Sequence, residues 1–269
     1  MIGAPSGRVA VSSKSARLAP GYRVIMTGPK TDCLSVSPLL VALAAPKEVR
    51  AALKGLGQVE ADIPPEWGVA VAGGVHVLRT GVGKVNAGAA VVSACGSLRP
   101  AAVLSIGIAG ALPGDDGMLP IGTVVVAGAS TYADEGLMGP EGFRTMSDLG
   151  FPLGAFEGNR INAEDGLVAA LMEVLADLSP VCATVATVST CSGTDGLARQ
   201  VAVNTGARAE AMEGAAVGHV CSRLGIAFAE VRVISNTTGD RSAQRWDLAR
   251  SLSGLAEVLG RIGRARVKG

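Results

Sequence analysis

The sequence predicts a single α/β domain built in three layers, with a mixed, mostly parallel sheet between two layers of helices. Short runs of branched apolar residues alternate with helical segments, and this alternation is typical of α/β folds. No internal repeat and no linker divides the part of the chain that we expect to be ordered. Glycine accounts for 37 of the 269 residues, about twice its average usage, which favours tight turns and close contacts between helices and strands.

Continuous apolar runs mark most of the expected strands, because strands that are covered on both faces show such runs. Two of the runs flank Gly73 and Gly74 and predict a hairpin. The expected strands span residues 39–45, 67–72, 75–80, 101–106, 124–127, 182–188 and 229–234.

Helical periodicity fills several of the stretches between these runs. It is clearest where Leu167, Leu171 and Leu178 fall on one face of a predicted helix. The polar residues 130–159 are irregular, and we expect them to cross the surface. The expected helices span residues 48–53, 164–178, 194–201 and 251–262, the stretch after the glycine turn at 80–83, and the apolar segment that follows Glu213.

Charge and composition exclude several classes of protein. The formal net charge is +1, so the sequence shows no excess of positive charge that would favour binding to nucleic acid or to an anionic membrane surface. No apolar run has the length needed to span a bilayer. The cysteines are scattered and lack metal-ligand spacing, which argues against a disulfide framework or a zinc site and fits a reducing cytoplasm. They are Cys33, Cys95, Cys182, Cys191 and Cys221.

Residues 1–37 differ in composition from the rest of the chain. They contain five basic residues and one acid, Asp32, among many Ser, Gly and Pro residues. An acid-poor basic leader is compatible with a targeting segment, but a secretory apolar region is missing. The many glycine, proline and serine residues favour a flexible extension. A start codon assigned too early in the gene would also explain this stretch. We therefore expect the folded domain to span residues 38–269.

Polar side chains interrupt and end the strand predicted at residues 229–234. Arg232 lies inside this apolar run, and Asn236 lies just past its end. In open α/β sheets, ligands bind outside the carboxyl ends of the strands. A buried arginine needs a carboxylate partner, which Glu213 or Glu48 would supply. From the residues alone, Glu213 is equally a helix-start carboxylate favoured by the helix dipole, and Glu48 an exposed helix glutamate.

Two glycines precede a predicted helix in the stretch T-G-V-G-K-V-N-A, residues 80–87. Such a turn can present backbone N–H groups to an anion such as phosphate. The stretch matches neither G-x-G-x-x-G nor a Walker sequence, so close packing of the helix on the sheet is an equal alternative. A dinucleotide site is not predicted, because no acidic residue follows at the ribose-binding distance.

Six motifs occur along the chain in one order, and together they resemble the purine nucleoside phosphorylase/uridine phosphorylase superfamily. The resemblance covers nearly everything after residue 38 and implies a nucleoside phosphorylase-like fold with a nucleoside substrate. The motifs are A-A-P-K-E-V (44–49), T-G-V-G-K-V-N-A (80–87), S-I-G-I-A-G-A-L (105–112), S-G-T-D-G-L-A (192–198), M-E-G-A-A (212–216) and V-R-V-I-S-N (231–236).

Departures from the phosphorylases point to the nucleosidase branch, whose members use water as the nucleophile. A-A-P-K-E stands in place of the phosphate-binding turn, and the arginine that precedes S-I-G-I-A-G in phosphorylases is missing. The adenine-releasing nucleosidases carry Asp in place of Asn236, and that acid can protonate the departing purine. An amide instead donates hydrogen bonds to N7 or O6, so the resemblance implies a 6-oxopurine base.

The resemblance also implies roles for the candidate catalytic residues. Glu213 would hold the ribose hydroxyls and help to fix the water, Glu48 would polarise that water, and Arg232 would pair with these carboxylates. Lys84 and His219 are expected to have structural roles. The partners are a small nucleoside and water, with no nucleic acid, membrane, cofactor or metal, and the family implies a homodimer.

For the base, the resemblance names Asn236 first, followed by the backbone of Thr190 and Cys191. Asp240 is an alternative acid for the departing base. An adenine-releasing nucleosidase and a non-catalytic nucleoside-binding protein stay open as alternatives, although a mere binding protein has no need of water-activating carboxylates. The remaining candidate substrate-binding residues are Ile108, Gly110, Met212 and Ser235.

Three more stretches match a family within this branch whose substrate carries a carboxylate on its 5′ side. The resemblance implies that Trp246 packs near the ribose and its 5′ substituent. Arg245 or Arg241 would bind the carboxylate. The matching stretches are residues 132–136, 141–152 and 237–247.

Overall fold

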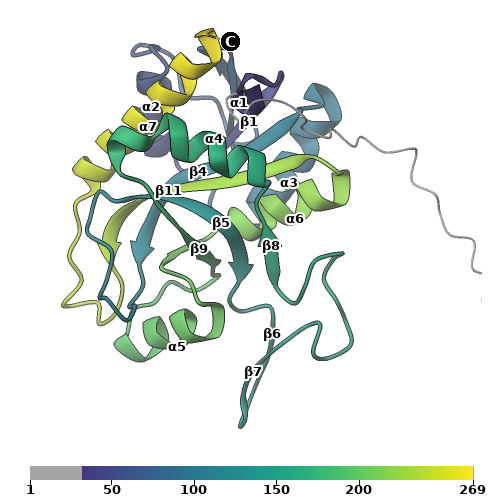
Figure 1. Cartoon of the computed structure of the whole chain (residues 1–269), viewed down its shortest axis with the longest axis vertical. Coiled ribbons are helices and arrows are strands. Elements are labelled where there is room, and N and C mark those ends of the chain that lie inside the picture. Colours follow the sequence, from purple (N-terminus) through teal and green to yellow (C-terminus); the bar gives the residue numbers. More distant parts are fainter. Residues whose placement is uncertain (1–31, 269) are drawn as a thin grey trace, which may run out of the picture.

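The structure of the protein, a computed structural model, describes residues 32–268 (Figure 1). The predicted extension therefore lies outside the described residues up to residue 31. Helix α1 (Asp32–Ser35) contacts α4 (Asp165–Val174) and α7 (Leu248–Lys268), and Leu34 is fully buried. The packed part of the chain thus includes residues before 38, earlier than the predicted domain boundary.

A mixed sheet forms the centre of the molecule, as predicted, and nine of the described strands belong to it (Figure 1). They are β1 (Leu39–Leu43), β2 (Val69–Ala72), β3 (Val75–Arg79), β4 (Ala102–Ala111), β5 (Val124–Tyr132), β8 (Arg160–Asn162), β9 (Val181–Thr187), β10 (Ala209–Ala211) and β11 (Ala227–Thr237). Their order is β10-β9-β5-β11-β4-β1-β3-β2, and β8 pairs with β5. The pairs β1–β3, β1–β4, β4–β11, β5–β9 and β9–β10 are parallel.

Strand β10 also pairs with β4, in the antiparallel direction. Strands β4, β11, β5, β9 and β10 therefore form a closed ring at one end of the sheet. Small and branched side chains such as Ala109, Val125, Val185, Ala209 and Ile234 form one cluster between these strands. The closure was not predicted, because a strand of three residues is too short to leave a pattern in the sequence.

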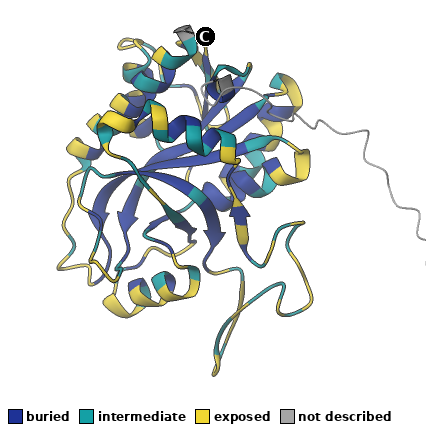
Figure 2. Cartoon of the chain, viewed as in Figure 1, coloured by how far each residue is buried: buried dark blue, intermediate teal, exposed yellow. Residues whose placement is uncertain are grey.

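Helices cover both faces of the sheet, which gives the predicted three layers (Figure 1). Helices α1, α2 (Pro46–Gly55), α4 and α7 share one hydrophobic core with the sheet, and α3 (Lys84–Leu98) and α6 (Gly214–Leu224) share another. Helix α5 (Asp195–Thr205) packs against β9. Figure 2 shows the sheet buried and the helices exposed along their outer faces.

Three strands run further than predicted: β4 to Ala111, β5 to Tyr132 and β11 to Thr237. In β4 the prediction stopped at Ile106, where Gly107 and Gly110 interrupt the apolar pattern. Both glycines instead pair with residues of β11 and stay in the ladder. The extended ends of β4 and β11 carry the candidate site.

The predicted hairpin is confirmed, since β2 and β3 pair across Gly73 and Gly74. These glycines have φ angles of 53° and 72°, which glycine adopts without steric cost. The region predicted as irregular, residues 130–159, contains a second hairpin of β6 (Gly136–Gly139) and β7 (Gly142–Thr145), which projects from the body (Figure 1). Among the described helices, none is long and apolar enough to cross a membrane.

Candidate active site

Glu48, Glu213 and Arg232 come together beside the carboxyl-terminal half of β4. Arg232 is only 2% exposed, and its Nη1 lies 3.3 Å from Oε2 of Glu213. A methyl group placed on Gly107 would lie 2.5 Å from Nη1 of Arg232 and 2.7 Å from Oε1 of Glu48. Both polar atoms therefore approach the bare Cα of this glycine, and the predicted pairing of the buried arginine with a carboxylate is confirmed.

A third carboxylate, Glu230, completes this cluster and was missed in the sequence. Its Oε1 lies 2.7 Å from Nε of Arg232, and its Oε2 accepts a short hydrogen bond from the Ser130 hydroxyl. Nη2 of Arg232 donates to Oγ of Ser105 at 3.1 Å. The signal was the spacing E-V-R, because residues two apart on a strand project to the same face.

Glu48 is buried, not an exposed helix residue. Its Oε2 accepts a hydrogen bond from the backbone N–H of Ala45 at 2.8 Å, and its Oε1 accepts one from Ile108 at 2.9 Å. Burial raises the pKa of the Glu48 carboxyl and repulsion by Glu213 raises it further, against the lowering effects of Arg232 and the two N–H groups. A carboxylate with a raised pKa is a stronger proton acceptor than an ordinary glutamate.

Glu213 immediately precedes α6 and is 7% exposed. It accepts hydrogen bonds from the backbone N–H of Gly83 at 3.1 Å and of Met212 at 3.3 Å. Gly83 has a φ of 94°, which glycine adopts without steric cost. One N–H of the glycine turn therefore faces a carboxylate of the chain itself, and this contact disfavours the alternative of a phosphate cradle.

Asn236 lies at the end of β11 with its amide held in one orientation. A register shift in β11 at Ser235 brings Asn236 opposite Gly110 of β4. The Ser235 hydroxyl lies 2.8 Å from Oδ1 of Asn236 and 3.1 Å from the Ala109 carbonyl, and its one proton can go to either oxygen. Nδ2 of Asn236 donates to the carbonyl of Thr237 at 3.0 Å. The second N–H of the amide is therefore left for a ligand. Gly110, which has no side chain, lies opposite Asn236 on β4.

The other predicted base contacts lie in the loop after β9. Thr190 and Cys191 are exposed, whereas Ser192 is buried and bonded to Glu210 of β10 through its backbone N–H and its hydroxyl. Glu210 raises the pKa of the Cys191 thiol, although burial has the larger effect. The two hydrogen bonds from Ser192 to Glu210 place the loop close to β10, whose Glu210 pairs with Gly110.

Asp240 lies in the loop that follows β11 and bonds to the start of α5. It is exposed, its Oδ1 accepts a hydrogen bond from the backbone N–H of Asp195 at 3.0 Å, and its own N–H donates to Asp195. Because Asp195 begins α5, the carboxylate anchors the loop to a helix amino end. Its role as an alternative acid for the departing base stays a prediction.

The loop that follows β11 folds back on the strand end. Trp246 bridges Asn236 through the backbone, and its ring is 52% exposed. The guanidinium of Arg241 lies 5.1 Å from the centre of that ring, and both side chains donate to Oε1 of Gln244. Arg245 is exposed and contacts the strand only through its backbone. Of the two candidate arginines, the structure thus brings Arg241 to the indole.

Lys84 and His219 have the structural surroundings that were expected. Lys84 forms ion pairs with Asp134 and Glu135 and lies over the ring of Tyr132. Nδ1 of His219 lies 3.3 Å from the Tyr132 hydroxyl. Both residues contribute to the surface between α3 and α6.

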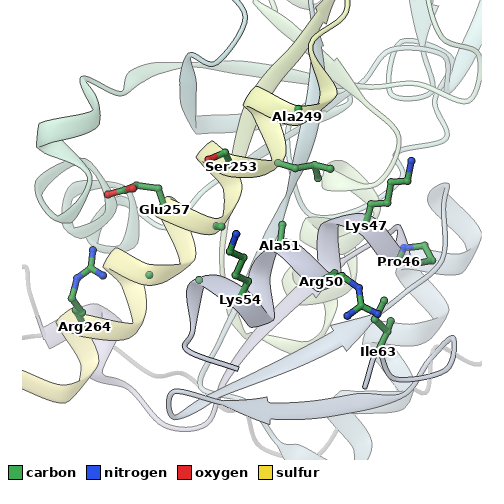
Figure 3. Close-up of a pocket in the computed structure, with 14 residues that line it drawn as sticks. Pro46, Lys47, Arg50, Ala51, Lys54, Ile63, Ala249, Ser253, Glu257 and Arg264 are labelled. Atoms are coloured by element: carbon green, nitrogen blue, oxygen red, sulfur yellow. The ribbon is translucent and has the colours of Figure 1, made fainter. Parts of the chain in front are cut away.

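A broad groove between α2 and α7 lies outside this site (Figure 3). Basic side chains line much of it, and none of the predicted site residues belongs to it. Its charged residues are Lys47, Arg50, Lys54, Glu257 and Arg264. No group of three or more His, Cys, Asp or Glu residues that could hold a metal ion occurs in the described part of the chain.

A buried arginine among carboxylates, beside an oriented amide at the strand ends, suits a ligand with hydroxyl groups and an activated water. Residues 44–266 match the sequence profile of the phosphorylase superfamily, and the chain belongs to that superfamily. Within it, the chain is 34% identical to futalosine hydrolase of Thermus thermophilus over 193 residues, 70% of this chain and 81% of that protein. It is 37% identical to futalosine hydrolase of Acidothermus cellulolyticus over 166 residues, which span 61% of this chain and 64% of that protein.

Solved structures support the fold. A futalosine hydrolase mutant of Helicobacter pylori superimposes with a TM-score of 0.66 at 22% identity, over 87% of this chain and 99% of that one. A 5′-methylthioadenosine/S-adenosylhomocysteine nucleosidase from Neisseria meningitidis superimposes with a TM-score of 0.68 at 18% identity, over 84% of this chain and 98% of that one. The predicted nucleoside phosphorylase-like fold is therefore confirmed.

Proposed function

We propose that this protein hydrolyses the N-glycosidic bond of futalosine, releases hypoxanthine and thereby serves menaquinone biosynthesis. Similarity to two futalosine hydrolases at 34% and 37% identity supports this substrate. The observation that supports the choice of base is the amide of Asn236, whose Nδ2 donates one N–H to the Thr237 carbonyl and keeps the other for an acceptor. N7 and O6 of hypoxanthine are both acceptors.

In this proposal the carboxylates activate water. The C1′–N9 bond breaks, the ribosyl group develops oxocarbenium character, and the bonding pair leaves with the base, which then takes a proton from solvent water. Glu48 takes a proton as the water oxygen bonds to C1′, which suits its raised pKa. Glu213 holds the ribose hydroxyls, and Arg232 keeps the two carboxylates close despite their repulsion. Asn236 stabilises the charge that develops on the departing purine.

The 5′ side of the substrate lies toward Trp246 in this proposal. Futalosine carries a carboxylate there, and Arg241 is the stronger candidate to bind it because it stacks on the indole. Arg241→Ala should raise the KM for futalosine about tenfold, in keeping with the loss of an exposed charged contact. Arg245→Ala is the matched control and should leave the KM unchanged. The reverse result would assign the carboxylate to Arg245.

One assay tests the proposed function. The full chain is incubated with futalosine, inosine or methylthioadenosine, with and without phosphate, and free bases are separated by chromatography. We expect hypoxanthine from futalosine at a rate that does not depend on phosphate. Release of adenine as the main product would favour the adenine-releasing nucleosidases, to which the chain is also similar. Absence of any free base would favour a nucleoside-binding protein.

Three further parts of the proposal concern the whole protein. We infer a homodimer, as the family resemblance implies, and a cytoplasmic location, which the scattered cysteines without metal-ligand spacing fit. We also infer that the nucleosidase domain includes α1, because Leu34 is buried in the shared core. No residue of the proposed machinery requires a cofactor or a metal.

A further inference from the structure

The groove between α2 and α7 carries a cluster of positive charge that the proposed active site does not use (Figure 3). The groove has a volume of about 620 Å³. Four of its lining residues are exposed cations, and their side chains form no ion pair or hydrogen bond with another described residue. They are Lys47, Arg50 and Lys54 on α2 and Arg264 on α7.

Glu257 is the acid among the described residues that line the groove, and it does not neutralise these cations. Its Oε1 lies 3.1 Å from Nη2 and 3.2 Å from Nε of Arg261, one turn further along α7. Its charge is therefore compensated by an arginine outside the lining. The groove offers its positive charge to a ligand from outside the described residues.

The three cations of α2 form a row, because positions three and four residues apart lie on one face of a helix. Figure 3 shows Lys47, Arg50 and Lys54 along α2, with α7 across the groove. Like charges at this spacing repel one another, and Lys47 lies in the first turn, where the helix dipole disfavours a cation. The row therefore does not stabilise α2. Its ends are about 10 Å apart along the helix axis, which favours an elongated anion over a compact one such as phosphate.

An apolar floor lies between the cations. The two helices approach closely, since a methyl group placed on Gly260 would lie 3.1 Å from the carbonyl oxygen of Gly55. Aromatic rings, on which nucleic-acid bases stack, are missing from the described lining of the groove. An apolar floor with a basic edge instead suits an amphipathic helix, whose apolar face lies in the groove. The floor consists of Ala51, Gly55, Ile63, Leu252, Ala256 and Gly260.

The chain itself offers no acidic helix to match this groove in the part that the structure describes. None of the described helices carries more than two carboxylates, the number in α4. Residues 1–31 contain five basic residues and no acid, so their charge opposes binding here. Charge complementarity therefore favours a different protein over a second copy or the amino-terminal extension.

We propose that this groove binds an acidic amphipathic helix of a partner protein. Carboxylates at intervals of three or four residues along one edge of that helix pair with Lys47, Arg50 and Lys54. A carboxylate on the other edge pairs with Arg264, and small apolar residues pack on the floor. Because the row begins next to Glu48, the partner is held close to the active site. The inference goes beyond the proposed function and does not depend on the substrate.

The first test uses the full chain and a synthetic helical peptide with four glutamates at this spacing and with leucine and alanine on the adjoining face. Fluorescence anisotropy measures its Kd at low and at physiological ionic strength. We expect binding that weakens as salt is added, because exposed charges are screened. The same peptide with glutamine in place of glutamate should bind more weakly. Absence of binding, or equal binding of the neutral peptide, overturns the proposal.

Charge reversal locates the binding surface. Arg50→Glu on one wall and Arg264→Glu on the other should each raise the Kd about tenfold, because an attraction is replaced by a repulsion. Arg199→Glu is the matched control, since Arg199 is an exposed arginine of helix α5, and it should leave the Kd unchanged. Thermal unfolding verifies that each variant is folded, and Lys54→Glu replaces Arg50→Glu if that variant is not. Folded groove variants that keep the wild-type Kd overturn the proposal.

Photo-crosslinking identifies the natural occupant. A photoreactive amino acid replaces Ser253, an exposed residue of the groove, in cells of the source organism. Mass spectrometry of the cross-linked product should find a segment with carboxylates at helical spacing, and Arg50→Glu should abolish the cross-link. A cross-link to nucleic acid or to a segment without such carboxylates, or no cross-link without the Arg50 change, contradicts the proposed partner.

Discussion

At the scale of single residues, the proposed function makes Asn236 the position that decides which base is released. Its Nδ2 donates one N–H to the Thr237 carbonyl, so the amide presents its second N–H to a ligand. An aspartate in the same place would present two acceptors at neutral pH and one donor only when protonated. The same backbone therefore suits different bases, depending on one side chain.

Asn236→Asp should reduce hypoxanthine release from futalosine about 10- to 100-fold, because an ionised carboxylate faces the acceptors O6 and N7. Adenine release from methylthioadenosine should rise over its wild-type rate. Chromatography of the released bases measures both. Asn162→Asp, an exposed change of the same kind on β8, is the control. Wild-type selectivity in Asn236→Asp would contradict the role of the amide.

Glu48 should define the acid side of the pH profile. The carboxyl must be ionised to accept a proton, and its pKa lies above the ordinary glutamate value of 4.5. Activity should therefore fall as the pH is lowered, with a midpoint of kcat/KM above 4.5. Glu48→Gln should lower kcat about 10²- to 10⁴-fold and remove this limb. A midpoint at or below the ordinary value, or an active Glu48→Gln, would exclude Glu48 as the base.

At the scale of elements, the ends of strands β4, β10 and β11 carry the site. Strand β4 supplies two glycines: Gly107 leaves room for the cluster around Arg232, and Gly110 separates Glu210 from Asn236. The register shift in β11 at Ser235 places Asn236 opposite Gly110 of β4. The two glycines of β4 therefore leave room for side chains of the neighbouring strands, Gly107 for Arg232 and Gly110 for Asn236.

Gly107→Ala should harm both stability and activity. The added methyl group would approach Arg232 and Glu48 to within 2.7 Å, and overpacking of a buried site costs about 1–3 kcal/mol. Gly96→Ala, in helix α3, is the matched control, because nothing lies within 4 Å of the added group. It should stabilise the helix by about 0.5–1 kcal/mol and leave kcat unchanged. Denaturant unfolding and the futalosine assay measure the two effects. A Gly107→Ala protein with wild-type kcat would show that the cluster tolerates displacement.

At the scale of the whole molecule, the outer face of α3 is unusually apolar. Val85 is 82% exposed and Val92 is 52% exposed, and both line a groove between α3 and α6. Isolated exposed apolar residues are ordinary, but a groove lined by several of them marks a surface that suits a protein partner. This surface is the candidate contact of the inferred homodimer.

Sedimentation equilibrium should find a dimer of the wild-type chain, and Val85→Glu combined with Val92→Glu should shift it to monomer at micromolar concentration. The reason is that a charge buried in an interface without a partner is strongly unfavourable. Val203→Glu, at the exposed surface of α5, should leave the dimer intact. A wild-type monomer, or a double variant that stays dimeric, would contradict the assignment of this face.

Local sequence patterns predicted most of the elements because each has its own periodicity or glycine signal. The alternation of apolar runs with helices indicated three layers, and the paired glycines indicated the hairpin of β2 and β3. The motifs around Glu48, Glu213 and Arg232 indicated which residues belong to the site. These features depend on neighbours in the chain, so the sequence alone was sufficient for them.

The tertiary structure decided what depends on residues distant in the chain. The ring closes through β10, whose three residues have no pattern of their own, and this pairing brings Glu210 beside Asn236. Glu48 is buried only because the end of β4 covers it, and Glu230 reaches Arg232 only inside the folded sheet. Asp240 turns toward α5 because a helix amino end lies there. Burial, charge pairing and strand register arise from long-range contacts, which local pattern does not contain.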